Sequence, residues 1–294
     1  MNPFSMSGLS AALLVVFPAF ASAQDPTPEL FRELETKYIF GFTFGSDIGP
    51  EGERELELTT KVNLQKRTGS YAALEQEGEL EYNPTDSFQI ELGAAGVSHA
   101  ISSVEGFDDF HGANFGGLSS TFRYLLIARG PGSPIGLQIA VEPGWSRVDD
   151  AGKLVTTFGA ETRIIADTEL VPDRLFAAVN AIYAPEVARD FGDTKWERAS
   201  TLGVLGALTY RITPKVALGA ELEYYRAYGG LGLNTLAGDA LYVGPTFHLQ
   251  VTNKFILSAA FSTQIAGHAA SDANFLDLTN FSRNKALLRA VFEF

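Results

Sequence analysis

The 294-residue chain contains no cysteine, so disulfide bonds cannot contribute to its fold and an oxidising compartment poses no thiol hazard. After residue 23 it also lacks a long uncharged apolar run, which argues against a membrane-spanning helix in the remainder. Cationic residues are scarce, because 22 Lys and Arg stand against 35 Asp and Glu. The resulting formal charge of −13 argues against nucleic acid as a partner.

The first 23 residues have the pattern of a signal peptide. An apolar core runs from Leu9 to Phe20, and the small residues Ala21 and Ala23 stand at positions −3 and −1 before Gln24, where signal peptidase needs them. The alternative is an uncleaved anchor, but the run is shorter than the roughly 20 residues that span a bilayer. We therefore expect export with cleavage after Ala23, although the segment has no Lys or Arg before its apolar core.

Most of the remaining chain alternates apolar and polar residues with a period of two. In one run Leu56 and Leu58 alternate with Glu57 and Thr59, and similar runs recur to the C-terminus. Side chains of a strand point alternately to its two faces, so each run predicts a strand with one apolar face. A soluble β-sandwich would show the same alternation, so further features have to distinguish the two architectures.

Three features favour a membrane barrel over a sandwich. The runs are about 10 to 13 residues long, which suits a tilted crossing of a bilayer. Their second face carries Glu, Gln, Arg and Thr, although Phe176 and Ile182 interrupt it. Aromatic residues such as Tyr82, Phe88 and Tyr210 collect at strand ends, as in interfacial girdles. We expect an all-β, antiparallel transmembrane β-barrel of about 12 strands, within a range of roughly 10 to 14.

The expected organisation is a barrel over residues 54–294 behind a short lead-in. Residues 24–53 form an N-terminal periplasmic segment with an uncertain first strand, because the alternating aromatics of Tyr38–Phe44 would make a thirteenth strand and barrels have an even number. This run is either a strand with an unidentified partner or a segment in the lumen or periplasm. Long loops are expected on the outer side, and those at residues 100–113 and 227–239 could act as gates.

The end of the chain resembles a known signature. Phe294, Phe292 and Leu288 share one face of the last predicted strand, and this pattern is similar to the C-terminal signal of Gram-negative outer-membrane barrels. The resemblance implies the outer membrane as the location, with membrane lipids and the barrel-assembly machinery as partners. Residues 38–49 also resemble the start of a poorly characterised group of proteobacterial porin-like barrels.

The polar faces supply the candidate functional residues. Several carboxylates would share one wall of the lumen, where like charges need screening by water or cations. This indicates either a channel that prefers small polar or cationic solutes, or a solvated lumen without selectivity. The leading hypothesis is a porin-like channel for passive diffusion, monomeric or homo-oligomeric, with no cofactor. The lumen candidates are Glu55, Glu57, Glu75, Glu77, Glu79, Glu81, Glu91, Lys61, Arg123 and Arg163.

The alternatives are an outer-membrane lipid hydrolase and a structural or adhesion barrel. A hydrolase needs a serine within hydrogen-bond reach of a histidine. His99 and Ser102 are three residues apart and would lie on opposite faces of a strand, and His248 would face the lumen rather than the lipid. No zinc-binding spacing is present either. We therefore assign no catalytic residue and no metal ligand, and we expect the protein not to be an enzyme.

Overall fold

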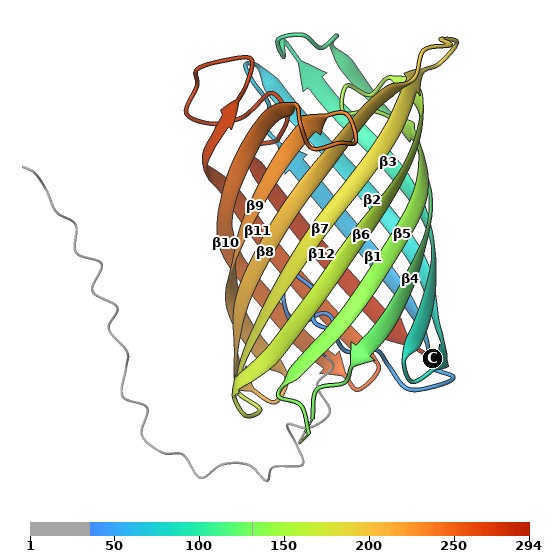
Figure 1. Ribbon diagram of the computed structural model, residues 1–294, viewed down its shortest axis with the longest axis vertical. Coiled ribbons are helices and arrows are strands. Elements are labelled where there is room, and N and C mark those ends of the chain that lie inside the picture. Colours follow the sequence, from blue (N-terminus) through green and yellow to red (C-terminus); the bar gives the residue numbers. More distant parts are fainter. Residues whose placement is uncertain (1–35, 131) are drawn as a thin grey trace, which may run out of the picture. The chain divides into compact units, whose positions relative to one another are not determined.

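The computed structural model describes residues 36–130 and 132–294, so the predicted signal peptide lies outside the described residues. Twelve antiparallel strands of the described chain form a closed barrel, in which β1 pairs with both β2 and β12 (Figure 1). The predicted all-β barrel and its strand number are confirmed. The strands are β1 (Arg54–Leu64), β2 (Ser70–Thr85), β3 (Phe88–Ser102), β4 (Phe110–Ile127), β5 (Ile135–Val148), β6 (Leu154–Val171), β7 (Leu175–Asp190), β8 (Glu197–Thr213), β9 (Val216–Gly229), β10 (Leu236–Thr252), β11 (Phe255–Ala269) and β12 (Asn284–Glu293).

The alternation read from the sequence decides which face of each strand meets the lumen. On β1, Glu57 and Thr59 are buried inside the barrel, whereas Leu58 is 47% exposed on the outside. Leu80 on β2 and Leu92 on β3 are exposed in the same way. Closure of the ring gives every strand two partners, which a hydrocarbon environment requires because it cannot satisfy a free strand edge. No helix of the described residues is long and apolar enough to cross a membrane.

The two ends of the barrel differ in the length of their connections. At the turn end, residues 86–87, 214–215 and 253–254 are tight two-residue turns between long strands. At the loop end the strands continue further than the sequence pattern predicted, so the expected loop 227–239 shrinks to residues 230–235. The longest loop of the described chain, residues 270–283, joins β11 to β12. The expected contrast between short turns and longer loops is therefore present.

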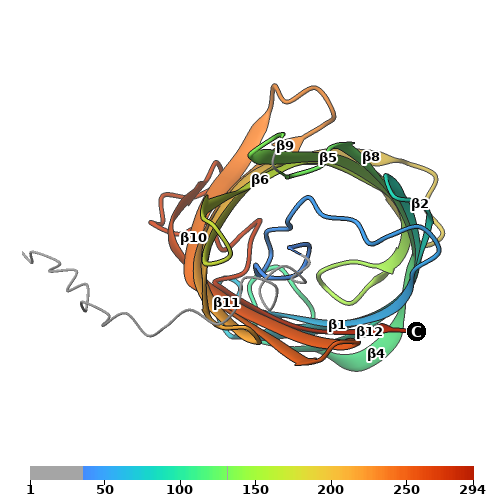
Figure 2. The same ribbon diagram turned by 90° about the horizontal axis from the view of Figure 1, so that it is seen from below.

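The aromatic run before β1 is not a thirteenth strand. It crosses the interior of the barrel, as the blue chain in Figure 2 shows. Tyr38, Ile39 and Phe40 are completely buried there. The ladder is closed by β1 and β12, which leaves no strand edge at which this segment could pair. We call residues 36–47 the plug.

Candidate functional site in the barrel lumen

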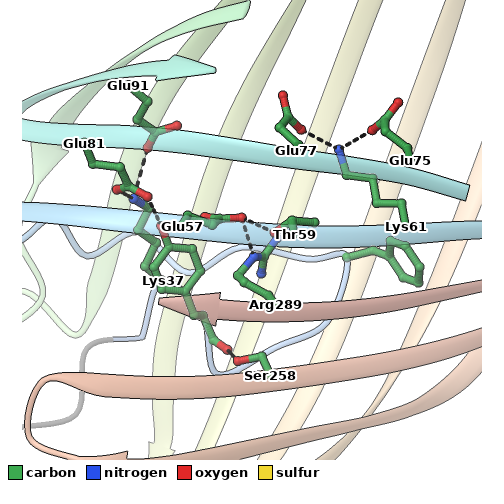
Figure 3. A network of polar contacts seen from close by, with 12 residues as sticks. Lys37, Glu57, Thr59, Lys61, Glu75, Glu77, Glu81, Glu91, Ser258 and Arg289 are labelled. Atoms are coloured by element: carbon green, nitrogen blue, oxygen red, sulfur yellow. Dashed lines mark hydrogen bonds and ion pairs between the residues drawn. The ribbon is translucent and has the colours of Figure 1, made fainter. Parts of the chain in front are cut away.

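The plug is held by a buried lysine near its start. Lys37 forms an ion pair with Glu81, and its Nζ lies 3.0 Å from Glu91 Oε1 and 2.8 Å from Gln89 Oε1. Burial acts to lower the pKa of Lys37, but the carboxylates of Glu81 and Glu91 outweigh it and hold that pKa above its usual range. The next residue adds a bond, because the Tyr38 hydroxyl donates to Glu81 at 2.6 Å. Figure 3 shows this cluster between the plug and the wall.

A second anchor joins the two ends of the plug. Asp167 on β6 accepts hydrogen bonds from the Thr36 hydroxyl at 2.7 Å, the Ser46 hydroxyl at 2.7 Å and the Ser46 amide at 3.1 Å. Arg129 donates to Asp167 at 2.7 Å and to Asp47 of the plug at 2.9 Å. Asp167 lies within β6, which runs on to Val171, and Arg129 lies in the connection between β4 and β5.

Side chains of the wall bind the backbone of the plug. Glu221 accepts from the amides of Phe42 and Thr43, both at 3.0 Å. Asn180 spans Phe44, since its Oδ1 accepts from the Phe44 amide at 2.8 Å and its Nδ2 donates to the Phe44 carbonyl at 2.9 Å. Buried peptide groups need such partners. The irregular segment can therefore stay inside the barrel without joining the sheet.

An apolar pocket in the wall receives the middle of the plug. Ile39 and Phe40 pack with Phe176, Ala178 and Ala207, and all five are buried. Phe176 is one of the two residues that interrupt the polar alternation of its strand. Its position is explained by this contact, because an apolar side chain on the lumen face is favourable only where another apolar group covers it.

Gly41 lies where the plug passes closest to the wall. A Cβ atom at this position would lie 2.2 Å from Glu221 Oε1 and 2.5 Å from the Ala260 Cβ. Both distances are far below van der Waals contact, so the docked plug leaves no space for a side chain. The close approach also brings Glu221 within reach of the neighbouring amides.

The lumen residues predicted from the sequence all lie on the interior face. Five of them, Glu55, Glu57, Glu81, Glu91 and Arg123, are buried. The other five, Glu75, Glu77, Glu79, Lys61 and Arg163, line internal cavities.

Most of these charges are paired within the wall. Arg123 Nε lies 2.6 Å from Glu91 Oε1. Lys61 Nζ lies 3.3 Å from Glu75 and 3.2 Å from Glu77, as Figure 3 shows. Both cations therefore neutralise carboxylates close to them on the same stretch of wall.

The remaining pairs involve two further arginines. Arg289 Nε lies 2.8 Å from Glu57 Oε1, and Arg163 Nη2 lies 2.7 Å from Glu161 Oε1. Glu161 is absent from the set of candidates predicted from the sequence, although it precedes Arg163 by two residues and so shares its strand face.

Two cavities lie above the plug. A floor cavity of about 160 Å³ is lined by the plug residues Phe42 and Phe44 and by charged wall residues. An upper cavity of about 360 Å³ shares Lys61, Glu77, Glu142 and Glu161 with it. In the described chain Glu79 and Glu142 have no hydrogen-bond or ion-pair partner, although both line the floor cavity. The floor therefore carries two more carboxylates than its own cations neutralise.

The loop that covers the mouth is not one of the two predicted gates. Residues 270–283 reach over the lumen, where the Tyr242 hydroxyl donates to the Ser282 carbonyl and Gln264 Nε2 donates to the Asp277 carbonyl at 3.1 Å. Both Asp277 and Ser282 are buried. This loop follows β11, and its residue Ser282 contacts Tyr242 of the lumen wall.

The histidines considered for hydrolysis have other environments. Ser102 Oγ lies 3.2 Å from His111 Nε2 rather than bonding to His99. His248 Nδ1 lies 3.2 Å from Ser258 Oγ inside the lumen, but that hydroxyl donates to the Tyr38 carbonyl of the plug at 2.6 Å. Within residues 36–130 and 132–294, no group of three or more His, Asp or Glu side chains could hold a metal ion.

Comparison with known proteins gives a family and a fold. The model of a family described as "Family of unknown function (DUF6662)" matches residues 33–294. Among solved structures, the COG4313 outer membrane channel from Pseudomonas putida F1 is similar with a TM-score of 0.56 and 15% identity, covering 85% of this chain and 98% of that one. The β domain of the Bordetella autotransporter BrkA has a TM-score of 0.54 and 13% identity, covering 83% and 100%. The translocator domain of NalP from Neisseria meningitidis has a TM-score of 0.50 and 11% identity, covering 85% and 91%. No curated protein matches the sequence. These likenesses show the fold of bacterial outer-membrane barrels.

Proposed function

The chain belongs to DUF6662, a family of unknown function, and we propose that it is a porin-like channel of the bacterial outer membrane through which small polar or cationic solutes diffuse. The observation that carries this proposal is the pair of charged cavities inside a closed barrel. A passive channel needs a water-filled path and a lining that favours its solutes, and it needs no catalytic group. Export with cleavage after Ala23 is part of the proposal.

The preference for cations follows from the lining of the upper cavity. Its wall contains seven carboxylate side chains, from Glu75 to Glu186 along the chain, and a single lysine, Lys61. Lys61 is already shared by Glu75 and Glu77. A narrow pathway with excess negative charge attracts cations and repels anions. The name of the Pseudomonas putida neighbour, an outer membrane channel, is consistent with such a role.

The plug closes the turn end of this path. The plug fills the lumen below the floor cavity and is held there by apolar and ionic contacts. The described conformation is therefore the closed state of the channel. Conduction then requires the plug to leave its binding positions on the wall. The barrel itself can stay intact, because the plug contributes no strand to the sheet.

The test is ion conduction by the purified full chain in planar bilayers. Discrete conductance steps are expected, with a reversal potential under a KCl gradient that shows cation preference. Replacing the unpaired floor carboxylates in the double variant Glu79→Gln and Glu142→Gln should reduce that preference. Glu51→Gln removes one exposed carboxylate outside the lumen, which is half the change of charge in the double variant, and serves as a control. Absence of steps at any voltage, in both the natural chain and a variant with a destabilised plug, would disprove the channel.

A further inference from the structure

An aromatic cage surrounds the ammonium group of Lys285 on β12. Its Nζ lies 4.5 Å from the ring centroid of Phe42, 4.7 Å from that of Tyr225 and 4.4 Å from that of Tyr242. The same Nζ lies 2.6 Å from Glu223 Oε2. Aromatic faces and a carboxylate around one nitrogen are the arrangement by which proteins recognise organic ammonium groups. Here the chain itself supplies the occupant.

The carboxylate of the cage has capacity beyond its present partners. Glu223 is completely buried, and its Oε2 also accepts from the Tyr225 hydroxyl at 2.8 Å. Its Oε1 is buried and has no hydrogen-bond partner in the described chain. A buried carboxylate oxygen without a donor is costly, so the site favours a ligand that brings further N–H groups.

The cage lies between the floor of the lumen and its mouth. Phe42 lines the floor cavity, whereas Tyr225, Tyr242 and Lys285 line a third cavity of about 230 Å³. This third cavity is bordered by Ser282 of the mouth loop and by the ion pair of Lys66 with Asp150. A solute that enters from the loop end therefore passes this ion pair before it reaches the cage.

We propose that this cage is a binding site for solutes that carry a primary ammonium group, which takes the place of the Lys285 ammonium beside Glu223. One wall of the cage is Phe42, and Phe42 belongs to the plug. Exchange of the occupant thus weakens a contact that holds the plug in the lumen. The consequence for opening rests on the proposed channel function, whereas binding of the ammonium does not.

The cage gives the site chemical selectivity. The two tyrosines and Phe42 offer ring faces to a cation, and their summed attraction is lost for a neutral solute of the same shape. Anions are disfavoured by Glu223, which is buried beside the cage. Short diamines suit this arrangement, because one ammonium can occupy the cage while the other faces the carboxylates of the floor cavity, which Phe42 also lines.

Calorimetric titration of the detergent-solubilised full chain with 1,4-diaminobutane tests the site. Lys285→Met should bind the diamine about tenfold more tightly than the natural chain, because the competing internal ammonium is gone. Tyr242→Leu and Phe42→Leu should each weaken binding about tenfold, through loss of one ring face. Lys254→Met, at an exposed lysine of the turn end, should change nothing, and neutral 1,4-butanediol should not bind.

The outcomes separate this site from the general acidity of the lumen. Diamine binding that is unchanged in Tyr242→Leu and Phe42→Leu would place the ligand elsewhere and overturn the proposal, even if Lys285→Met does not fold. Absence of binding to the natural chain and to folded Lys285→Met would overturn it as well. Diamine binding that depends on the cage residues, without any bilayer conductance, would instead refute the proposed channel function and support the proposed binding site.

Discussion

Replacement of Lys37 by methionine should open the lumen. The change keeps the length of the side chain but removes the charge that lies between Glu81 and Glu91. Lys37 is fully buried, as are both carboxylates, and removal of one partner from a buried ion pair typically costs about 3–5 kcal/mol. Glu91 keeps Arg123 as a partner at 2.6 Å, so the lower end of that range, about 3 kcal/mol, is the better figure.

This cost falls on docking of the plug rather than on the barrel. Release of the plug exposes Glu81 to water, and hydration then stabilises the carboxylate that has lost its partner. At 1.36 kcal/mol for each factor of ten, about 3 kcal/mol shifts the ratio of undocked to docked plug by roughly 100-fold. We therefore expect an increase of that order in the ratio of open to closed single channels.

Single-channel recording of Lys37→Met in planar bilayers measures this shift directly. Lys254→Met is the matched control, because its ammonium group is largely exposed and lies 3.5 Å from Glu293 at the surface. Surface pairs of this kind contribute about 0–1 kcal/mol, so the control should gate like the natural chain. An open fraction of Lys37→Met equal to that of the control would refute the role of Lys37 as an anchor.

Three further expectations concern the plug, the lining and assembly. Gly41→Leu should prevent docking of the plug without unfolding the barrel, because a Cβ would lie 2.2 Å from Glu221 Oε1. Limited proteolysis should then cut the segment before β1. Continued protection of that segment would contradict the close approach at Gly41. Cation preference should fall as the pH is lowered from 7 toward 4, because protonation removes the negative charge of the lining carboxylates, and a reversal potential that does not change would exclude them as the source of selectivity. Phe294→Asn should reduce the amount of folded barrel in the outer membrane, measured by heat-dependent gel mobility in cell fractions, if the C-terminal pattern acts as an assembly signal.

The strands could be predicted because a membrane barrel imposes one rule on every residue. A side chain in β1 faces either lipid or lumen, and the two directions alternate along the strand. The apolar Leu58 therefore faces outward and the neighbouring Glu57 faces the lumen. The same rule predicts from the sequence alone that Arg123 and Arg163 face the lumen. It also indicates that β1 begins near Arg54 and closes on the last strand.

The plug could not be placed by that rule, for a physical reason. Alternating aromatics such as Tyr38 and Phe40 show that a segment is covered by apolar surroundings, but lipid and a protein interior are equally apolar. Its contacts are made with residues far along the chain, from Glu81 to residues more than a hundred positions away such as Asp167 and Asn180, and a local sequence pattern carries no information about such contacts. The one local signal is Phe176, an apolar residue on a polar face, which marks the place where the plug packs.

Under the proposed channel function, gating and selectivity are coupled because Lys37 of the plug neutralises the stretch of wall that it covers. In the docked state Lys37 lies among Glu81 and Glu91, and Glu221 is occupied by the amides of Phe42 and Thr43. Departure of the plug removes Lys37 and uncovers Glu81 and Glu91 in the same stretch of lumen, whereas the plug as a whole is neutral because it also carries Asp47. That stretch is therefore more acidic in the open pore than in the closed one, and mobile cations stabilise the open pore by screening the uncovered carboxylates. The proposal thus gives the polar interior two roles, since the side chains that bind the plug in the closed state would form the cation-selective lining once the plug has left.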